Sequence, residues 1–358
     1  MEYGAINLSQ GFPDFQVDPV LVSLINKFMT DGHNQYAPMP GVPALRTVIA
    51  DVVAKTYAHT IDPETEITIT TGGTEGLFSA IAAFVHSGDE VIVFDPAYDS
   101  YNPAIRLNGG VPVHINLQYP DFSIDWQEVK SKITSRTRMI MINTPHNPSG
   151  AVLSEHDLRT LQAIAIEHDL IVLSDEVYER IIFDDRQHES VLKYPELRSR
   201  SIAVFSFGKT FHATGWKVGY CVAPATLTTE IRKAHQFITF SVNTPIQLAF
   251  AAYMKDPEHY EKLGSFYQQK RDYLLQGIKG SSWEPVACHG SYFQSLSYKH
   301  ISQSPDGEMA EELTKKYKIA SIPVSVFYND KSDNKLLRFC FAKNEKTLDQ
   351  AIEILRKF

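Results

Sequence analysis

LIVLSDEVYE, residues 170–179, combines a signal for the fold with a signal for a site. Its first half is an apolar run without alternation, which is typical of a strand buried on both faces of a mostly parallel sheet. Its second half is acidic and aromatic, and it begins where that strand is expected to end. Ligands of open α/β sheets lie beyond the carboxyl ends of the strands. The stretch therefore predicts a buried strand followed by a loop that faces a ligand.

Similar apolar runs recur over the first two thirds of the chain. Amphipathic stretches separate them, and in one of these Leu45, Ile49 and Val52 share a face at helical spacing. Alternation of buried strands with helices is typical of a mostly parallel sheet covered by helices, so the predicted fold class is α/β. The predicted strands are residues 67–70, 90–94, 111–115, 139–143, 170–174, 201–207 and 218–223.

The hydrophobic pattern of the sequence changes near residue 254, where longer helical patterns begin. These patterns cover 260–275, 308–316 and 347–358, with strands predicted between them at 292–297 and 336–341. The first thirty residues hold no strand of the main series, so they either join the smaller domain or lie across an interface. We expect a large domain at 31–255 and a small domain built from 1–30 and 256–358.

The composition favours a small-molecule role. The 358 residues carry a formal net charge of -8, which gives no electrostatic support for nucleic acid or an anionic membrane as partner. Cys221, Cys288 and Cys340 are far apart and odd in number, which argues against a disulfide framework and fits a reducing cytoplasm. No signal-peptide pattern opens the chain, and no apolar run has membrane-spanning length. We therefore expect a cytoplasmic protein.

Polar or aromatic residues follow five of the predicted strands, in TGGTEG, DPAYDSY, TPHNPSG, DEVYE and GKT. The glycines of TGGTEG lead into a helix whose free N–H groups can hold a phosphate. Singly, these residues have ordinary explanations: a tight turn at the glycines, a cap at Asp175, packing of Tyr98 and Tyr178, a turn at Asn147, and solvation of Lys209. Because all five loops occupy equivalent positions in the sheet, together they predict one ligand site.

Three basic residues have no evident carboxylate partner. The segment FSFGKTFHATGWKVGY, residues 205–220, contains Lys209 and Lys217 but no aspartate or glutamate. In LLRFCF, residues 336–341, strand alternation leaves Arg338 among apolar neighbours on both faces. A buried guanidinium needs an anionic partner. A structural carboxylate and a substrate carboxylate would both match its bidentate geometry.

The motifs SFGKTFHATGWKVGY, NTPHNPSG, SDEVYE and TGGTEG, with the late strand of Arg338, resemble the fold-type-I pyridoxal-phosphate aminotransferases of class I and II. Within that family, INLSQGFPDF, NQYAPMPGVPALR, FDPAYDSY and FSVNTP are most similar to the bacterial methionine aminotransferases and the related kynurenine and glutamine aminotransferases. The resemblance runs along the whole chain. It implies a three-layer α/β/α large domain with a mostly parallel seven-stranded sheet, a smaller α+β domain, and pyridoxal 5'-phosphate as cofactor.

The resemblance also implies roles around the cofactor ring. Lys209 matches the lysine that bonds to the cofactor aldehyde as an internal aldimine and later moves the substrate α-proton. Asp175 matches the aspartate that bonds the pyridine nitrogen. Tyr178 and Asn147 match the pair that hydrogen-bonds the phenolic oxygen, and Tyr98 matches the aromatic residue that stacks on the ring.

Further matches concern the phosphate and the substrate. Ser206 and Lys217 match side chains that contact the cofactor phosphate, together with the backbone N–H groups of Gly73 and Thr74. Tyr36 matches a tyrosine that reaches the phosphate of a neighbouring subunit, which implies a homodimer with shared active sites. The residues matched to the substrate carboxylate are Arg338, Gly11 and Asn147.

The function implied is a ping-pong aminotransferase that moves the amino group of methionine, or of another large uncharged or aromatic amino acid, to a 2-oxo acid. Two alternatives stay open. A cysteine-conjugate β-lyase would use the same lysine, aspartate and arginine. A non-catalytic regulatory module on the same fold would be expected to lack Lys209 or to carry a DNA-binding domain, and neither feature is seen. No metal site is predicted.

Overall fold

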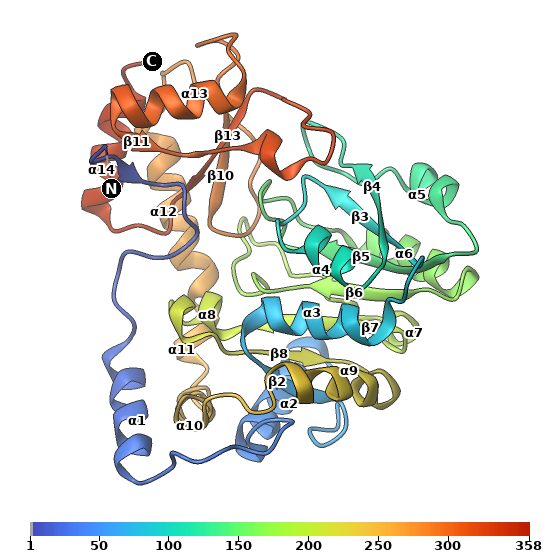
Figure 1. The fold of residues 1–358 in the computed structure, drawn as a ribbon. Helices are drawn as coiled ribbons and strands as arrows, with labels where there is room; N and C mark the ends of the chain where they lie inside the picture. Colours follow the sequence, from blue (N-terminus) through green and yellow to red (C-terminus); the bar gives the residue numbers. More distant parts are fainter. Residues whose placement is uncertain (1–2) are drawn as a thin grey trace.

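A seven-stranded sheet forms the centre of the computed structural model, which describes residues 3–358 (Figure 1). The strand order is β2-β8-β7-β6-β5-β3-β4, and only β8 runs antiparallel to its neighbours. The mostly parallel sheet predicted from the apolar runs is confirmed, with each strand end within two residues of its predicted position. The strands are β2 (Ile67–Thr70), β3 (Glu90–Asp95), β4 (Val111–Asn116), β5 (Thr137–Asn143), β6 (Ile171–Asp175), β7 (Ser201–Ser206) and β8 (Gly219–Val222).

Helices cover both faces of this sheet, because alternate residues of each strand are apolar on opposite sides. In β5, Ile140 and Ile142 belong to one apolar cluster and Met139 and Met141 to the other. The first face is covered by α2 (Pro43–Tyr57), α6 (Glu155–Glu167) and α10 (Thr244–Tyr253), and the second by α3 (Gly72–Phe84), α4 (Tyr101–Leu107) and α9 (Ala225–Ile238). The three-layer α/β/α architecture is therefore confirmed.

A second apolar core lies in the C-terminal part of the chain. Its sheet has the order β12-β13-β10-β9 with every pair antiparallel. The strands are β9 (Glu284–Pro285), β10 (Phe293–Ser297), β12 (Ile322–Pro323) and β13 (Leu336–Cys340), and the helices are α12 (Leu263–Gly277), α13 (Asp306–Glu312) and α14 (Glu345–Leu355). The shorter helices elsewhere are α5 (Trp126–Lys132), α7 (Pro195–Arg198), α8 (Phe207–Thr210) and α11 (Glu258–Glu261).

Residues 3–30 contact both cores. Strand β1 (Ile6–Asn7) pairs in parallel with β11 (Ile319–Ala320), beside the C-terminal sheet. Helix α1 (Pro19–Thr30) instead lies against the large core, into which it buries Leu21 and Ile25. The division into residues 31–255 and residues 1–30 with 256–358 stays a prediction.

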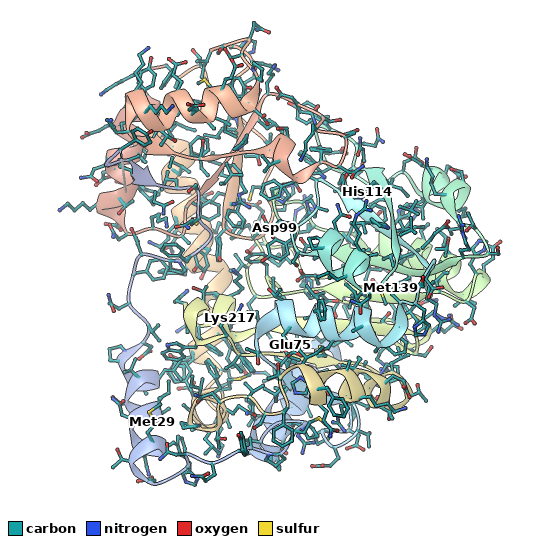
Figure 2. The ribbon with its side chains drawn as sticks, in the orientation of Figure 1. Met29, Glu75, Asp99, His114, Met139 and Lys217 are labelled. Atoms are coloured by element: carbon teal, nitrogen blue, oxygen red, sulfur yellow. The ribbon has the colours of Figure 1, made fainter. Side chains whose placement is uncertain are left out.

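Side chains fill the space between the two cores (Figure 2). The loop after β6 links them directly, because Tyr178, Ile181 and Phe183 pack into the C-terminal core while β6 itself lies in the main sheet. The carboxyl ends of the parallel strands thus face the second core. In residues 3–358, no helix is both long and apolar enough to cross a lipid bilayer.

Candidate active site

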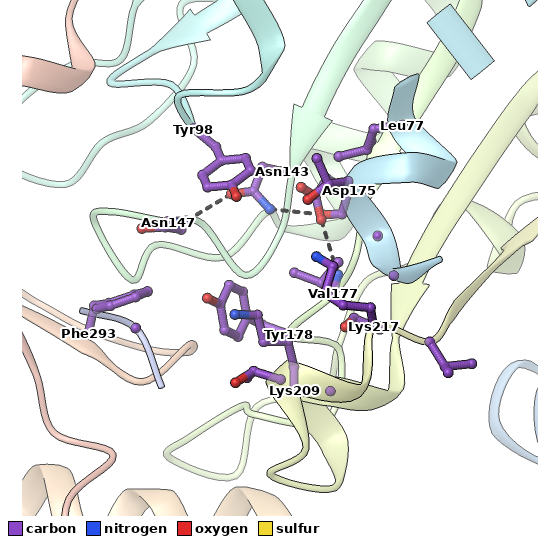
Figure 3. A pocket seen from close by; sticks show the side chains of 18 of the residues that line it. Leu77, Tyr98, Asn143, Asn147, Asp175, Val177, Tyr178, Lys209, Lys217 and Phe293 are labelled. Carbon is purple, nitrogen blue, oxygen red and sulfur yellow. Dashed lines mark hydrogen bonds between the residues drawn. The ribbon is translucent and has the colours of Figure 1, made fainter. Parts of the chain in front are cut away.

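A cavity of about 280 Å³ lies at the carboxyl ends of the parallel strands (Figure 3). It draws residues from the loops after β2, β3, β5, β6 and β7, as the strand-end pattern predicted, and from β10 and β13 of the second core. All residues that the sequence analysis assigned to the site line this cavity, except Tyr36. The assigned residues that line it are Gly11, Gly73, Thr74, Tyr98, Asn147, Asp175, Tyr178, Ser206, Lys209, Lys217 and Arg338.

One end of the cavity has the features of an anion site. Helix α3 begins there at Gly72, which has a φ of +74°, and the side chain of Thr71 makes no capping hydrogen bond. The first N–H groups of a helix have no partner within it, and their dipoles favour negative charge. Lys217 adds a cation: its Nζ lies 3.4 Å from the point that a Cβ on Gly72 would occupy (Figure 2). Ser206 adds a hydroxyl group to the lining.

Asp175 is a buried carboxylate without an ion-pair partner among residues 3–358. The Tyr101 hydroxyl donates to its Oδ2 at 2.6 Å, and the Val177 N–H donates to its Oδ1 at 3.2 Å. Asn143 donates to the backbone oxygen of Asp175 at 2.9 Å and so fixes this end of β6 (Figure 3). Burial raises the pKa of Asp175 to about 6, although the Tyr101 hydrogen bond acts in the opposite direction. A cationic N–H group would satisfy this carboxylate.

Lys209 lies in α8, directly after β7, and has no carboxylate within ion-pair distance in the described chain. Its Nζ donates to the Tyr292 hydroxyl at 2.9 Å. The rings of Tyr178 and Tyr292 lie 5.5 and 5.4 Å from the same nitrogen. Burial lowers the pKa of the Lys209 amine to about 8, since desolvation disfavours the ammonium form. A substantial neutral fraction near pH 7 to 8 makes the amine a competent base and nucleophile.

Arg338 lies on β13 with only 7% of its surface exposed. Its Nη1 donates to Asn147 Oδ1 at 2.7 Å and its Nη2 donates to the Ser9 carbonyl at 3.0 Å. Its Nε is buried without a partner, and the Phe293 ring centroid lies 3.9 Å from the guanidinium carbon. No carboxylate of residues 3–358 forms an ion pair with it. The structural-carboxylate alternative therefore has no support here, and the free N–H points to a ligand anion.

Tyr36 lies away from the cavity and is 82% exposed. Its ring meets the exposed Phe240 ring edge to face at 5.4 Å. Within one chain it has no contact with the site. A role in the site therefore requires a second copy of the chain.

Several residues that line or contact the site were not assigned from sequence, among them Asn143, Tyr101, Tyr292 and Phe293. Asn143 is the last residue of β5, so its strand-end position could have signalled it, whereas Tyr101 begins the short helix α4 and carries no such signal. Tyr292 and Phe293 come from the second core. Only the packing of the two cores brings Tyr292 to Lys209, whereas Phe293 meets Arg338 within the second core, where β10 pairs with β13. No local pattern marks them.

Residues 3–355 match the family model described as aminotransferase class I and II. The chain belongs to the class I and II aminotransferases. It is 50% identical to the methionine aminotransferase of Escherichia coli over 357 residues, covering 99% of this chain and 92% of that protein. It is 35% identical to kynurenine–oxoglutarate transaminase 3 of Mus musculus over 382 residues, which cover 98% of this chain and 84% of that protein. The crystal structure of YbdL from Escherichia coli, described as having a methionine aminotransferase function, superposes with a TM-score of 0.98 at 50% identity over 100% of this chain and 95% of that one.

Aminotransferases of this family depend on pyridoxal 5'-phosphate, and this chain is a PLP-dependent aminotransferase. The chemistry of the cavity fits the cofactor. A helix N-terminus with Lys217 suits a phosphate, the buried Asp175 carboxylate suits a protonated ring nitrogen, and the Lys209 amine suits an aldehyde. The free Nε of Arg338 suits the carboxylate of an amino acid or a 2-oxo acid, which are the substrates of an aminotransferase.

Proposed function

We propose that this aminotransferase takes methionine, or another large uncharged or aromatic amino acid, as amino donor and a 2-oxo acid as acceptor. The observation that carries the proposal is the placement of Lys209, Asp175 and Arg338 around one cavity in a chain 50% identical to a methionine aminotransferase. The similarity to kynurenine transaminases supports the extension to aromatic donors.

The residues proposed to hold the cofactor are those that line the cavity beyond the strand ends. Bound there, the cofactor supplies an aldehyde that exchanges amino groups and a ring that withdraws electrons from the substrate Cα. The phosphate would be held by the α3 N-terminus, Ser206 and Lys217. The ring would be held by Tyr98, Asn147, Asp175 and Tyr178, and the aldehyde by Lys209.

Proton movement is proposed to depend on Lys209 Nζ. The lowered amine pKa, about 8, provides a neutral base that can take the proton from the substrate Cα. Asp175 keeps its negative charge through the Tyr101 and Val177 hydrogen bonds, and so stabilises a positive N–H opposite it. Burial of the Tyr178 hydroxyl raises its pKa, so that it acts as a neutral donor.

Substrate orientation is proposed to come from Arg338. Asn147 and the Ser9 carbonyl fix the guanidinium plane, and the unpaired Nε is left to donate to the substrate carboxylate. A fixed carboxylate restricts rotation of the substrate about Cα, which favours loss of the Cα proton over other bond cleavages. The Gly11 backbone borders the same region of the cavity.

We further propose a homodimer in which Tyr36 reaches the partner's phosphate site, and a cytoplasmic location. The dimer proposal is supported by the exposure of Tyr36 and its distance from the cavity of its own chain. The location is supported by three free cysteines, all of them buried.

The decisive experiment is a half-reaction. The cofactor-loaded protein is mixed with L-methionine without an acceptor, and the released 2-oxo acid and the aminated cofactor are quantified. We expect stoichiometric amounts of both from the wild type, none from Lys209→Ala, and wild-type amounts from the surface control Lys233→Ala, which removes an exposed lysine of α9. A cysteine S-conjugate is tested in parallel, because pyruvate as the dominant product would identify a β-lyase and overturn the proposal.

A further inference from the structure

Tyr292 places a hydroxyl group directly beside the Lys209 amine. It immediately precedes β10 in the second core and its side chain is fully buried. Its oxygen lies 2.9 Å from Lys209 Nζ and 2.5 Å from the Gly11 carbonyl oxygen. Its ring packs edge to face on Tyr178, with ring centroids 5.1 Å apart. The hydroxyl therefore lies between the amine and the N-terminal segment.

The Tyr292 hydroxyl has three polar neighbours: the Gly11 carbonyl, the Lys209 amine and the Tyr178 hydroxyl. A carbonyl oxygen can only accept, so the single Tyr292 O–H proton is directed to Gly11. Lys209 therefore faces a lone pair of the Tyr292 oxygen, and the amine must donate the 2.9 Å hydrogen bond. A neutral amine that donates an N–H keeps its own lone pair free.

We propose that Tyr292 is a positioning residue for the proton transfer: its oxygen holds the free amine of Lys209 by accepting one N–H, while the amine lone pair remains available to the substrate. The proposal rests on the proposed role of Lys209. When the substrate Cα–H bond breaks, the amine lone pair forms the new N–H bond, the C–H electron pair stays on the substrate side, and the Tyr292 O–H bond is unchanged.

The N-terminal segment fixes this arrangement. The Gly11 carbonyl holds the Tyr292 proton, the neighbouring Ser9 carbonyl accepts from Arg338, and the Phe12 carbonyl accepts from Lys343 Nζ at 2.9 Å. If the Gly11 carbonyl were displaced, the Tyr292 proton could turn toward the amine and occupy its lone pair. The hydrogen bond between Tyr292 and Gly11 thus links the position of the N-terminal segment to the availability of the Lys209 lone pair.

The test compares Tyr292→Phe with Tyr267→Phe. Both variants keep an aromatic ring in the second core, where the two ring centroids are 5.7 Å apart. Tyr267 is also fully buried, but its hydroxyl contacts His212 Nδ1 at 2.9 Å and not Lys209. The pair therefore isolates the hydroxyl that touches the amine. Thermal unfolding of each apoprotein checks that both variants are folded.

Two measurements are made on each protein. The first is steady-state kinetics with methionine, in which Tyr292→Phe should lower kcat by about ten- to a hundredfold because the amine is no longer held in place, and should change KM much less. The second is the rate at which the apoprotein captures pyridoxal phosphate covalently, followed by absorbance against pH. The midpoint of capture, which reports the amine pKa, should fall in Tyr292→Phe because the ammonium form loses its acceptor. Tyr267→Phe should match the wild type in both.

Wild-type kcat and an unshifted capture profile in Tyr292→Phe would overturn the proposal. A raised KM with unchanged kcat would also overturn it, because that result would indicate a role only in holding the N-terminal segment. A second experiment on the wild type distinguishes failure of the Tyr292 proposal from failure of the proposed function. Borohydride reduction fixes the cofactor on the lysine that binds it, and peptide mapping locates that lysine. If it is not Lys209, the assignment of the base itself is wrong.

Discussion

Charged groups in the cavity find their partners outside the chain. Lys217 and Arg338 Nε have no anionic partner, and Asp175 has no cationic one, within the described residues. Arg338 and Asp175 are buried, and buried charge without a partner costs stability, so we expect a ligand to supply the missing charge. Cofactor binding should therefore stabilise the protein, since a ligand that binds only the folded state raises its free energy of unfolding.

Asp175 gives the apoprotein a specific pH dependence. Its folded-state pKa, about 6, lies above the ordinary value of 3.8, so the folded state binds more protons than the unfolded state between these values. The free energy of unfolding should fall as the pH rises from about 4 through about 6, by up to about 3 kcal/mol from this group. Urea unfolding of the apoprotein against pH measures this slope.

Two variants test the assignment of that slope. Asp175→Asn should remove the contribution of Asp175 to the pH dependence of the free energy of unfolding. An unchanged slope in this variant would contradict the assignment to Asp175. Tyr101→Phe should raise the pKa of Asp175 further, because the lost hydrogen bond is one that lowers it. The free energy of unfolding of Tyr101→Phe should therefore continue to fall up to a higher pH than that of the wild type.

The site depends on how closely elements approach at the start of α3. Gly219 on β8 pairs with Ser206 on β7, and a Cβ on Gly219 would lie 2.5 Å from the Phe205 carbonyl oxygen and 2.9 Å from the Gly72 carbonyl carbon. Both are backbone atoms and cannot turn aside. Glycine at this position thus allows the strand to lie against the helix start that is proposed to bind phosphate.

Gly219→Ala should force these elements apart. We expect a loss of about 1–3 kcal/mol in the free energy of unfolding and about tenfold weaker cofactor binding. Gly215→Ala is the matched control in the same segment, because a Cβ there would meet nothing within 4 Å. Urea unfolding and cofactor titration measure both effects, and equal behaviour of the two variants would refute the explanation.

Over the whole molecule, the cavity lies where two apolar cores meet, and the N-terminal segment crosses between them. Strand β1 joins the second core, α1 joins the first, and the segment between them supplies Gly11 to the cavity. Exposed aromatic side chains remain elsewhere on the surface, with Phe237 at 87%, Tyr36 at 82% and Phe240 at 44% exposure. Among these, the Tyr36 and Phe240 rings touch each other, and we expect this part of the surface to meet a second copy of the chain.

The proposed dimer makes Tyr36 testable. Sedimentation velocity should show a dimer for the wild type. Tyr36→Ala should weaken cofactor retention by about ten- to a hundredfold, because a hydrogen bond to a charged group contributes about 1.5–3 kcal/mol. Leu107→Ala, which alters an exposed apolar residue at the end of α4, serves as the control. A monomeric wild type, or normal cofactor retention in Tyr36→Ala, would contradict a shared site.

Sequence patterns predicted much of the fold and part of the site. Unalternating apolar runs located the main strands, and the polar groups after them, such as Asp175 and Lys209, proved to line one cavity. Tyr101 was not assigned, because a tyrosine on a short helix is usually a packing residue. Its role became visible only through the 2.6 Å contact with a residue 74 positions away.

By itself, the sequence determined the α/β class, the order of the main strands along the chain and the chemistry that each strand end carries, because these follow from local hydrophobic patterning. The tertiary structure alone decided which distant groups meet: Arg338 with Asn147, and Tyr292 with Lys209 and Gly11. Such contacts depend on how two separate cores pack together. No local pattern encodes that packing, so the partners of the reacting amine became known only from the folded chain.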